Sequence, residues 1–152
     1  MTNHTSKTFL LADDDRDDRD LFSEALAALD PEIVCQGAED GKQALKLLAT
    51  SPSRPSIIFV DINMPVMNGW DFLRKLKSDE QYLNIPVVVY STSSRAKDRE
   101  IAQELGAVCF VTKPDNFKMV KVMLEVVLDH VKRNSLHHMC ERIHGTLKTP
   151  LD

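Results

Sequence analysis

The sequence of 152 residues contains no apolar run approaching the roughly 18 residues that would suggest a membrane span. Its first seven residues also lack the long apolar stretch of a secretory signal peptide. The formal net charge is −4, so the chain has no electrostatic footprint for nonspecific DNA binding. We therefore predict no membrane span and no direct contact with nucleic acid.

Cysteine is also scarce, with only Cys35, Cys109 and Cys140 scattered along the chain. Two of the three lie in apolar segments, where a free thiol behaves as a small hydrophobic side chain. An odd, scattered set of this kind does not indicate a disulfide framework. We expect free thiols and a reducing cytoplasmic location.

Short apolar runs alternate with longer segments of helical period along most of the chain. The predicted strands are Phe9–Ala12, Ile33–Gln36, Ile57–Val60, Val87–Tyr90 and Val108–Val111. The predicted helices are Arg16–Leu29, Gly41–Ala49, Trp70–Lys77, Arg95–Leu105 and Phe117 to about Val131. Such alternation predicts an α/β fold, in which helices cover both faces of a parallel sheet.

The segment 133–152 is too short to bury a hydrophobic core of its own. We predict one domain over residues 7–132, followed by a tail or a helix extension and no separate output domain.

Polar residues follow four of the five predicted strands. They are Asp13, Asp14 and Asp15; Asp61; Ser91 and Thr92; and Thr112, Lys113 and Pro114. In an open parallel sheet, ligands bind beyond the carboxyl ends of the strands, so these side chains should converge on one rim. Clustered carboxylates favour a hard divalent cation, for which Mg²⁺ is the natural candidate. Together with a lysine and a hydroxyl, they form a receptor for a phosphoryl group, with an aspartate available as nucleophile.

Four motifs carry a family resemblance over about residues 7–132. They are Leu11-Ala12-Asp13-Asp14, Val60-Asp61-Ile62-Asn63-Met64-Pro65 with Asn68-Gly69, Tyr90-Ser91-Thr92, and Val111-Thr112-Lys113-Pro114. In combination they resemble the receiver domain of two-component response regulators. The resemblance implies a flavodoxin-like (βα)5 fold, doubly wound, with a five-stranded parallel sheet in the order 2-1-3-4-5.

The resemblance also implies a role for each matching position. Asp61 corresponds to the phosphoacceptor, and the Mg²⁺ ligands correspond to Asp13, Asp14, Asp61 and the backbone carbonyl of Asn63. Ser91 and Lys113 correspond to the groups that hold the phosphoryl oxygens. Ser91 and Phe110 correspond to the switch pair, and the bond between Lys113 and Pro114 corresponds to a cis peptide bond.

Several alternatives remain open at this point. The acidic pair can be Asp14-Asp15 instead of Asp13-Asp14, in which case Asp15 is not simply a helix N-cap. Asp13, Asp15, Asp17 and Glu24 also have the spacing of an EF-hand loop, although Asp18 stands where glycine is needed and a strand precedes. Phe110 can be plain core packing. His137, Cys140 and His144 share one helical face and can be read as a metal site.

The function that this resemblance implies is a single-domain response regulator. A sensor histidine kinase or phosphotransfer protein would phosphorylate Asp61, and the phosphorylated form would contact a downstream protein. A homodimer through the fourth helix and fifth strand is possible in such proteins. Apart from Mg²⁺-dependent self-phosphorylation and autodephosphorylation, we expect no enzymatic activity. The competing hypotheses are a metal-dependent phosphohydrolase and a degenerate receiver that serves as a docking module.

Overall fold

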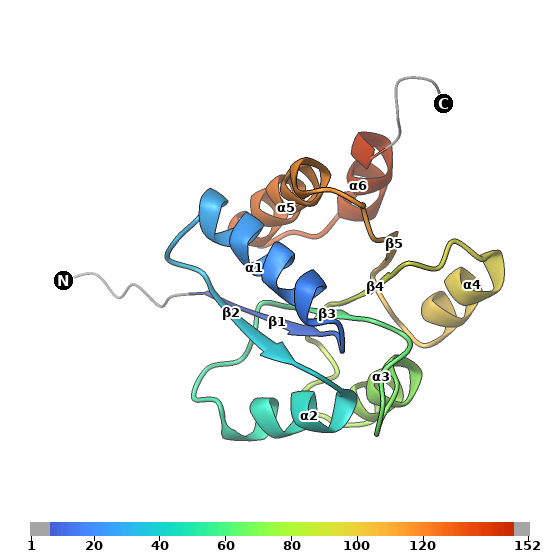
Figure 1. The fold of residues 1–152 in the computed structure, drawn as a ribbon. Helices are drawn as coiled ribbons and strands as arrows, with labels where there is room; N and C mark the ends of the chain where they lie inside the picture. The colour runs from blue at the N-terminus through green and yellow to red at the C-terminus, as the bar shows by residue number, and fades with distance from the viewer. Residues whose placement is uncertain (1–6, 148–152) are drawn as a thin grey trace.

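The computed structural model describes residues 7–147, which form one five-stranded parallel sheet (Figure 1). The strands are β1 (Thr8–Ala12), β2 (Val34–Ala38), β3 (Ile57–Val60), β4 (Val87–Ser91) and β5 (Cys109–Thr112). Their order in the sheet is β2-β1-β3-β4-β5, and every neighbouring pair is parallel. The predicted fold class and strand order are confirmed.

Six helices connect or follow the strands. They are α1 (Arg16–Leu29), α2 (Gly41–Thr50), α3 (Gly69–Lys77), α4 (Ala96–Glu104), α5 (Phe117–Lys132) and α6 (Met139–Leu147). Strand residues alternate between two hydrophobic clusters: one packs against α1, α5 and α6, and the other against α2, α3 and α4. This layering leaves β1, β3 and β4 buried on both faces, as their uninterrupted apolar sequences predict. No helix within residues 7–147 is long and apolar enough to cross a membrane.

The end of the chain differs from the prediction. Helix α5 ends at Lys132 and is not extended; after a turn with positive φ at Asn134 and His138, the chain forms the separate helix α6. Met139 and Ile143 of α6 are 1% and 0% exposed and belong to the same cluster as α1 and α5. The segment predicted as a tail or a helix extension therefore contains a separate helix that packs on the domain.

The cysteines also differ from the prediction. Cys109 of β5 and Cys140 of α6 form a disulfide with a Cα–Cα distance of 5.4 Å, within the range that a disulfide spans. The expectation of three free thiols was wrong because α6 returns to the end of the sheet at β5. Cys35 alone is free among the three, and burial raises the pKa of its thiol to about 11.

Candidate functional site

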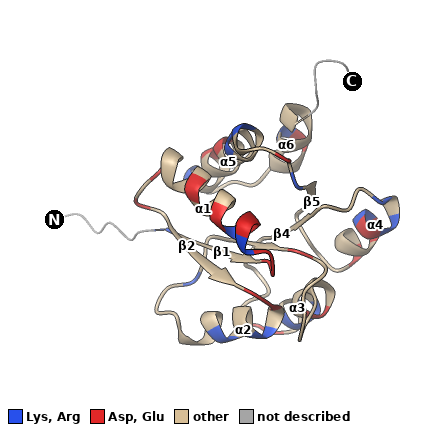
Figure 2. Cartoon of the chain, in the orientation of Figure 1, with Lys and Arg blue, Asp and Glu red and all other residues tan. Residues whose placement is uncertain are grey.

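The carboxyl ends of β1 and β3 bring three carboxylates together. β1 and β3 are neighbours, with Ala12 opposite Val60, so Asp13 and Asp61 leave the sheet side by side. Oxygen atoms of Asp13, Asp14 and Asp61 all lie within 4.8 Å of one another. Figure 2 shows acidic residues concentrated here, where the first turn of α1 meets the ends of these strands. The structure therefore brings Asp13, Asp14 and Asp61 together at this rim, as the sequence predicts.

Lys113 supplies the positive charge of the cluster. It follows β5, and its Nζ lies 2.7 Å from Oδ2 of Asp13, 2.8 Å from Oδ2 of Asp18 and 2.9 Å from Oδ2 of Asp61. Its side chain is only 6% exposed, and those of Asp13 and Asp61 are 0% and 13% exposed. One buried ammonium therefore faces three carboxylates, which leaves an excess of negative charge.

This imbalance shifts the ionisation of both buried groups. Burial alone would lower the pKa of Lys113, but the hydrogen bonds that Lys113 donates to Asp13 and Asp18 and the charge of Asp61 outweigh it and raise the pKa above its usual value. Burial raises the pKa of Asp13, and the contact with Lys113 opposes this only in part. Lys113 thus stays charged, whereas burial makes the negative charge of Asp13 energetically unfavourable.

One oxygen of Asp13 offers a test of whether a cation fits the cluster. Oδ1 accepts a hydrogen bond from the Asp15 N–H at 2.9 Å. Oδ2 is fully buried and accepts no hydrogen bond of good geometry, although it lies close to Lys113 Nζ. Its near neighbour is the Lys113 ammonium, which Asp18 and Asp61 share. The clustered carboxylates of Asp13, Asp14 and Asp61 carry more negative charge than one ammonium offsets, so this donor set fits Mg²⁺ or a similar hard ion.

The remaining acidic residues divide into a cap and an additional site residue. Oδ1 of Asp15 accepts the N–H groups of Asp17 and Asp18, which confirms it as the N-cap of α1. The EF-hand hypothesis is wrong because β1, not a helix, precedes this loop. Asp18 contacts Lys113, a contact that sequence reasoning missed; its only signal is its place in the first turn of α1, facing back toward the rim.

The loop after Asp61 is shaped by close backbone contacts. Oδ1 of Asp61 accepts the N–H of Ile62 at 2.7 Å, which orients the carboxylate. The N–H of Gly69 donates to the Ile62 carbonyl at 2.8 Å, and a Cβ at Gly69 would lie 2.1 Å from the Asp61 carbonyl oxygen. Only glycine therefore allows α3 to begin against Asp61. Asn63 lies in this loop and is exposed, and no contact tests its predicted carbonyl ligand.

Ser91 ends β4 on the same rim. Its hydroxyl accepts the N–H of Ser93 at 3.1 Å, and its carbonyl accepts the N–H of Lys113 at 2.7 Å. Ser93 in turn donates to Oδ2 of Asp98 at 2.6 Å, and its carbonyl accepts the hydroxyl of Thr112 at 2.9 Å. These bonds hold the β4–α4 loop in one position. Ser91 is buried within them, and within residues 7–147 its hydroxyl makes no hydrogen bond to Asp61.

Phe110 lies in β5 with its ring on the α4 face of the sheet. The ring is buried, and the Arg99 guanidinium lies 5.2 Å from its centroid. The structure thus places the Phe110 ring in a buried position beside α4. Its role as a switch stays a prediction.

The predicted cis bond between Lys113 and Pro114 was wrong, because the described residues contain no cis peptide bond. An X–Pro bond favours trans by roughly 0.5–1 kcal/mol unless contacts select cis. Here the trans chain already directs Lys113 Nζ to all three carboxylates and its N–H to Ser91. No contact is left that a cis bond would be needed to make.

The proposed histidine and cysteine cluster of the tail is also not formed as predicted. His144 and Cys140 do lie together, but their third neighbour is Cys109, and the two cysteines are bonded to each other. His137 is exposed and packs against His138 instead.

Comparison with known proteins agrees with this geometry. The family model described as "Response regulator receiver domain" matches residues 9–125. The chain belongs to this family, and is a receiver domain of the two-component response regulators, which signal through phosphorylation.

Two curated relatives are similar over most of their own length. Chemotaxis protein CheY1 of Helicobacter pylori is 31% identical over 78% of this chain and 94% of its own. Response regulator Rcp1 of Synechocystis is 32% identical over 78% of this chain and 84% of its own. By contrast, a probable cyclic di-GMP phosphodiesterase of Vibrio cholerae is 30% identical over 90% of this chain, which spans only 30% of that protein.

Solved structures show the same fold. The phosphorylated cyanobacterial phytochrome response regulator RcpA matches with a TM-score of 0.79 and 29% identity, over 86% of this chain and 97% of its own. The Mn²⁺-bound form of Rcp1 matches with a TM-score of 0.73 and 30% identity, over 81% and 95% of the two chains.

Proposed function

We propose that Asp61 accepts a phosphoryl group from a phosphohistidine of a sensor histidine kinase or phosphotransfer protein. An Asp61 oxygen attacks phosphorus, the P–N bond to the histidine breaks, and a P–O bond to the carboxylate forms. The observation that carries this proposal is the contact of the Lys113 ammonium with Asp61 Oδ2, at 2.9 Å, between two largely buried side chains. Lys113 can hold a phosphoryl oxygen beside the attacking carboxylate without moving far, so positioning and electrostatics supply the catalysis.

The negative charge of the cluster requires a divalent cation before another anion can enter. We assign this place to Mg²⁺, held by the carboxylates of Asp13, Asp14 and Asp61 and by the Asn63 carbonyl. The three carboxylates that lie within 4.8 Å of one another support this assignment, as does the similarity of this chain to Rcp1, which has been solved in a Mn²⁺-bound form. When bound, the cation neutralises charge on the phosphoryl oxygens.

Phosphorylation would then act on Ser91 and Phe110. The phosphoryl group carries about 1.5 to 2 negative charges where the Asp61 carboxylate carried one, and the Ser91 hydroxyl can leave the Ser93 N–H and donate to a phosphoryl oxygen. Movement of the β4–α4 loop frees space for the Phe110 ring to shift. Inverting a two-state population from 1:99 to 99:1 requires about 5.5 kcal/mol. Two to four charge-assisted hydrogen bonds of roughly 1.5–3 kcal/mol each are sufficient.

The test of phosphorylation is the intact mass after incubation with Mg²⁺ and acetyl phosphate or a phosphoramidate. We expect one added phosphoryl group on the wild-type chain and none on Asp61→Asn. Asp20→Asn is the matched control, since Asp20 is an exposed carboxylate of α1 outside the cluster, and should label fully. Turnover of varied phosphate monoesters would instead assign a phosphohydrolase. A chain that binds no metal and forms no adduct would be a docking module.

Signalling would proceed through protein contacts. We propose a downstream protein as the target, with α4 and β5 as the face for a possible homodimer, and the cytoplasm as the location, where kinase partners act. Ser91→Ala should still be labelled but should bind the target more weakly in its labelled form. Unchanged binding by that variant would refute the role of Ser91.

A further inference from the structure

The disulfide joins the receiver fold to a helix that lies beyond the residues matched by the family model. Cys109 lies in β5, within the matched residues 9–125, whereas Cys140 lies in α6, beyond them. The two cysteines are 31 positions apart in sequence, so the bond closes a loop that contains all of α5. It is the single covalent link between α6 and the sheet in the described structure.

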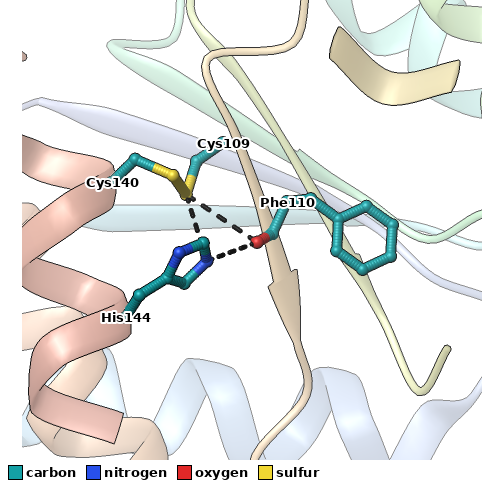
Figure 3. The surroundings of a disulfide bond; sticks show 4 residues. All are labelled: Cys109, Phe110, Cys140 and His144. Carbon is teal, nitrogen blue, oxygen red and sulfur yellow. Dashed lines mark hydrogen bonds between the residues drawn. A yellow bond between two sulfur atoms is a disulfide. The ribbon is translucent and has the colours of Figure 1, made fainter. Parts of the chain in front are cut away.

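A hydrogen bond beside the disulfide reaches the backbone of Phe110. Nε2 of His144 lies 2.8 Å from the Phe110 carbonyl oxygen, and because a carbonyl only accepts, Nε2 carries the proton (Figure 3). The same nitrogen lies 4.0 Å from Cys109 Sγ. Figure 3 shows the Phe110 ring directed away from the disulfide. Helix α6 thus contacts the backbone of the strand residue whose side chain faces α4.

Helix α6 also packs against α5. Arg142 Nη1 donates to Asp129 Oδ2 at 2.6 Å and to His130 Nε2 at 3.0 Å. Met139 and Ile143 are buried against the α5 side of the core. Helix α6 therefore has noncovalent contacts that can place it near β5 without the disulfide, and this placement brings the two sulfur atoms together for oxidation.

The disulfide is accessible from one side. Cys109 is 4% exposed and Cys140 is half-buried. Both line a cleft of about 350 Å³ together with Arg99, Gln103 and Phe110. A low-molecular-weight thiol can reach the bond through this cleft, with Cys140 the more open of the two sulfur atoms.

We propose that Cys109 and Cys140 form a reversible thiol–disulfide site that fastens α6 to β5. In the oxidising direction, the Cys140 thiolate attacks a small disulfide RSSR and releases RS⁻. The Cys109 thiolate then attacks Cys140 Sγ and releases the second RS⁻. Two protein thiols are oxidised, RSSR is reduced to two RSH, and two excess thiols reverse the process. Disulfides that form in reducing compartments are usually transient or redox-sensing, which suits a site of this kind.

The signalling consequence rests on the proposed function, whereas the redox site itself does not. With the bond closed, α6 is held at the Phe110 backbone; with the bond open, only noncovalent contacts hold it there. Reduction should therefore change how readily the region around Phe110 responds to phosphorylation of Asp61.

The redox site is tested by equilibrating the full chain with glutathione mixtures of graded ratio, quenching in acid and alkylating in denaturant. We expect one alkylated cysteine, Cys35, at the oxidising end and three at the reducing end. Cys35→Ser, the matched control, should shift these numbers to zero and two without moving the midpoint. Three alkylated cysteines in the wild type at every ratio would overturn the proposal. It would also be overturned if Cys109, Cys140 and His144 in the reduced protein bind added Zn²⁺ and the bound Zn²⁺ prevents oxidation of the two cysteines.

The fastening is tested by hydrogen exchange of the α6 amides. Reduction should speed their exchange at least tenfold in the wild type, while Cys140→Ser should exchange fast in both buffers. Equal α6 exchange in oxidised and reduced wild-type protein would overturn the proposal. Acetyl phosphate labelling of the two forms is measured in parallel: if neither form is labelled, the proposed function fails, and the thiol and exchange data still judge the redox site.

Discussion

Replacing Lys113 by methionine removes the only ammonium that contacts the carboxylates of Asp13, Asp18 and Asp61 in the described chain, at nearly constant side-chain volume. Asp13 is 0% exposed and Asp61 13% exposed, so both would keep charges that water screens poorly. Removing one partner of a buried ion pair costs about 3–5 kcal/mol. Since Asp18 is one-third exposed, we assign the cost to the other two and expect the lower half of that range.

The dependence on pH and metal follows from the same charges. Without Lys113, burial keeps the folded pKa of Asp13 raised above its unfolded value. A group with a raised folded pKa binds more protons in the folded state, so the stability deficit of Lys113→Met should narrow as pH falls from 7 to 5. Mg²⁺ should stabilise the variant more than the wild type, because no ammonium competes for the carboxylates.

The assay is urea unfolding followed by circular dichroism, at both pH values and with and without Mg²⁺. Lys132→Met is the control, because its partner Asp30 lies 3.1 Å away in a pair whose lysine is 56% exposed. The control should lose less than about 1 kcal/mol. If Lys113→Met stays within about 1 kcal/mol of the wild type at pH 7 in the absence of metal, our account of the buried charges is refuted.

Three further substitutions test the start of α3, helix α6 and the β4–α4 loop. Gly69→Ala should abolish or slow labelling of Asp61, because the alanine Cβ would lie 2.1 Å from the Asp61 carbonyl oxygen. At Gly145 an added Cβ meets no atom within 4 Å, so Gly145→Ala should stabilise α6 by about 0.5–1 kcal/mol, measured by thermal melts. Asp98→Asn should cost about 1 kcal/mol at pH 7. The hydrogen bond from the Ser93 hydroxyl, and to a lesser degree that from Arg95, lowers the pKa of Asp98. The contribution of the Asp98 carboxylate to the stability of the fold is therefore lost as pH falls through the folded pKa. Urea titrations at pH 7 and pH 3 should therefore show a smaller Asp98→Asn difference at pH 3 than at pH 7.

The central part of the fold could be predicted because β1, β3 and β4 are short apolar runs with a turn or a helix start beside each of them. Helix α1 was placed with both ends at the residues that the structure gives. The site residues Asp13, Asp61 and Lys113 could be predicted from the rule that parallel strands end at one rim. Asp18 could not, because its contact depends on the angle at which the first turn of α1 leaves Asp15.

The end of the chain was predicted least well. Leu136, Met139, Cys140, Ile143 and Leu147 do have helical spacing, but a nine-residue helix has little stability alone and depends on the surface that it packs against. The disulfide could not be predicted, since three cysteines allow several pairings and only the return of α6 to β5 selects one. The trans bond before Pro114 was predicted wrongly because the cis bond was inferred from the family resemblance, whereas an X–Pro peptide bond by itself slightly favours trans.

Helix α6 also makes the two outer strands of the sheet unequal. Within residues 7–147, β2 pairs only with β1 and exposes Val34, whereas β5 pairs only with β4 and has α6 packed beside it. Unpaired strand edges invite pairing with strands of other chains. The Phe110 carbonyl of β5 already accepts a hydrogen bond from His144 of α6, so β5 offers fewer free backbone groups to another strand than β2 does, and edge-to-edge association should favour β2.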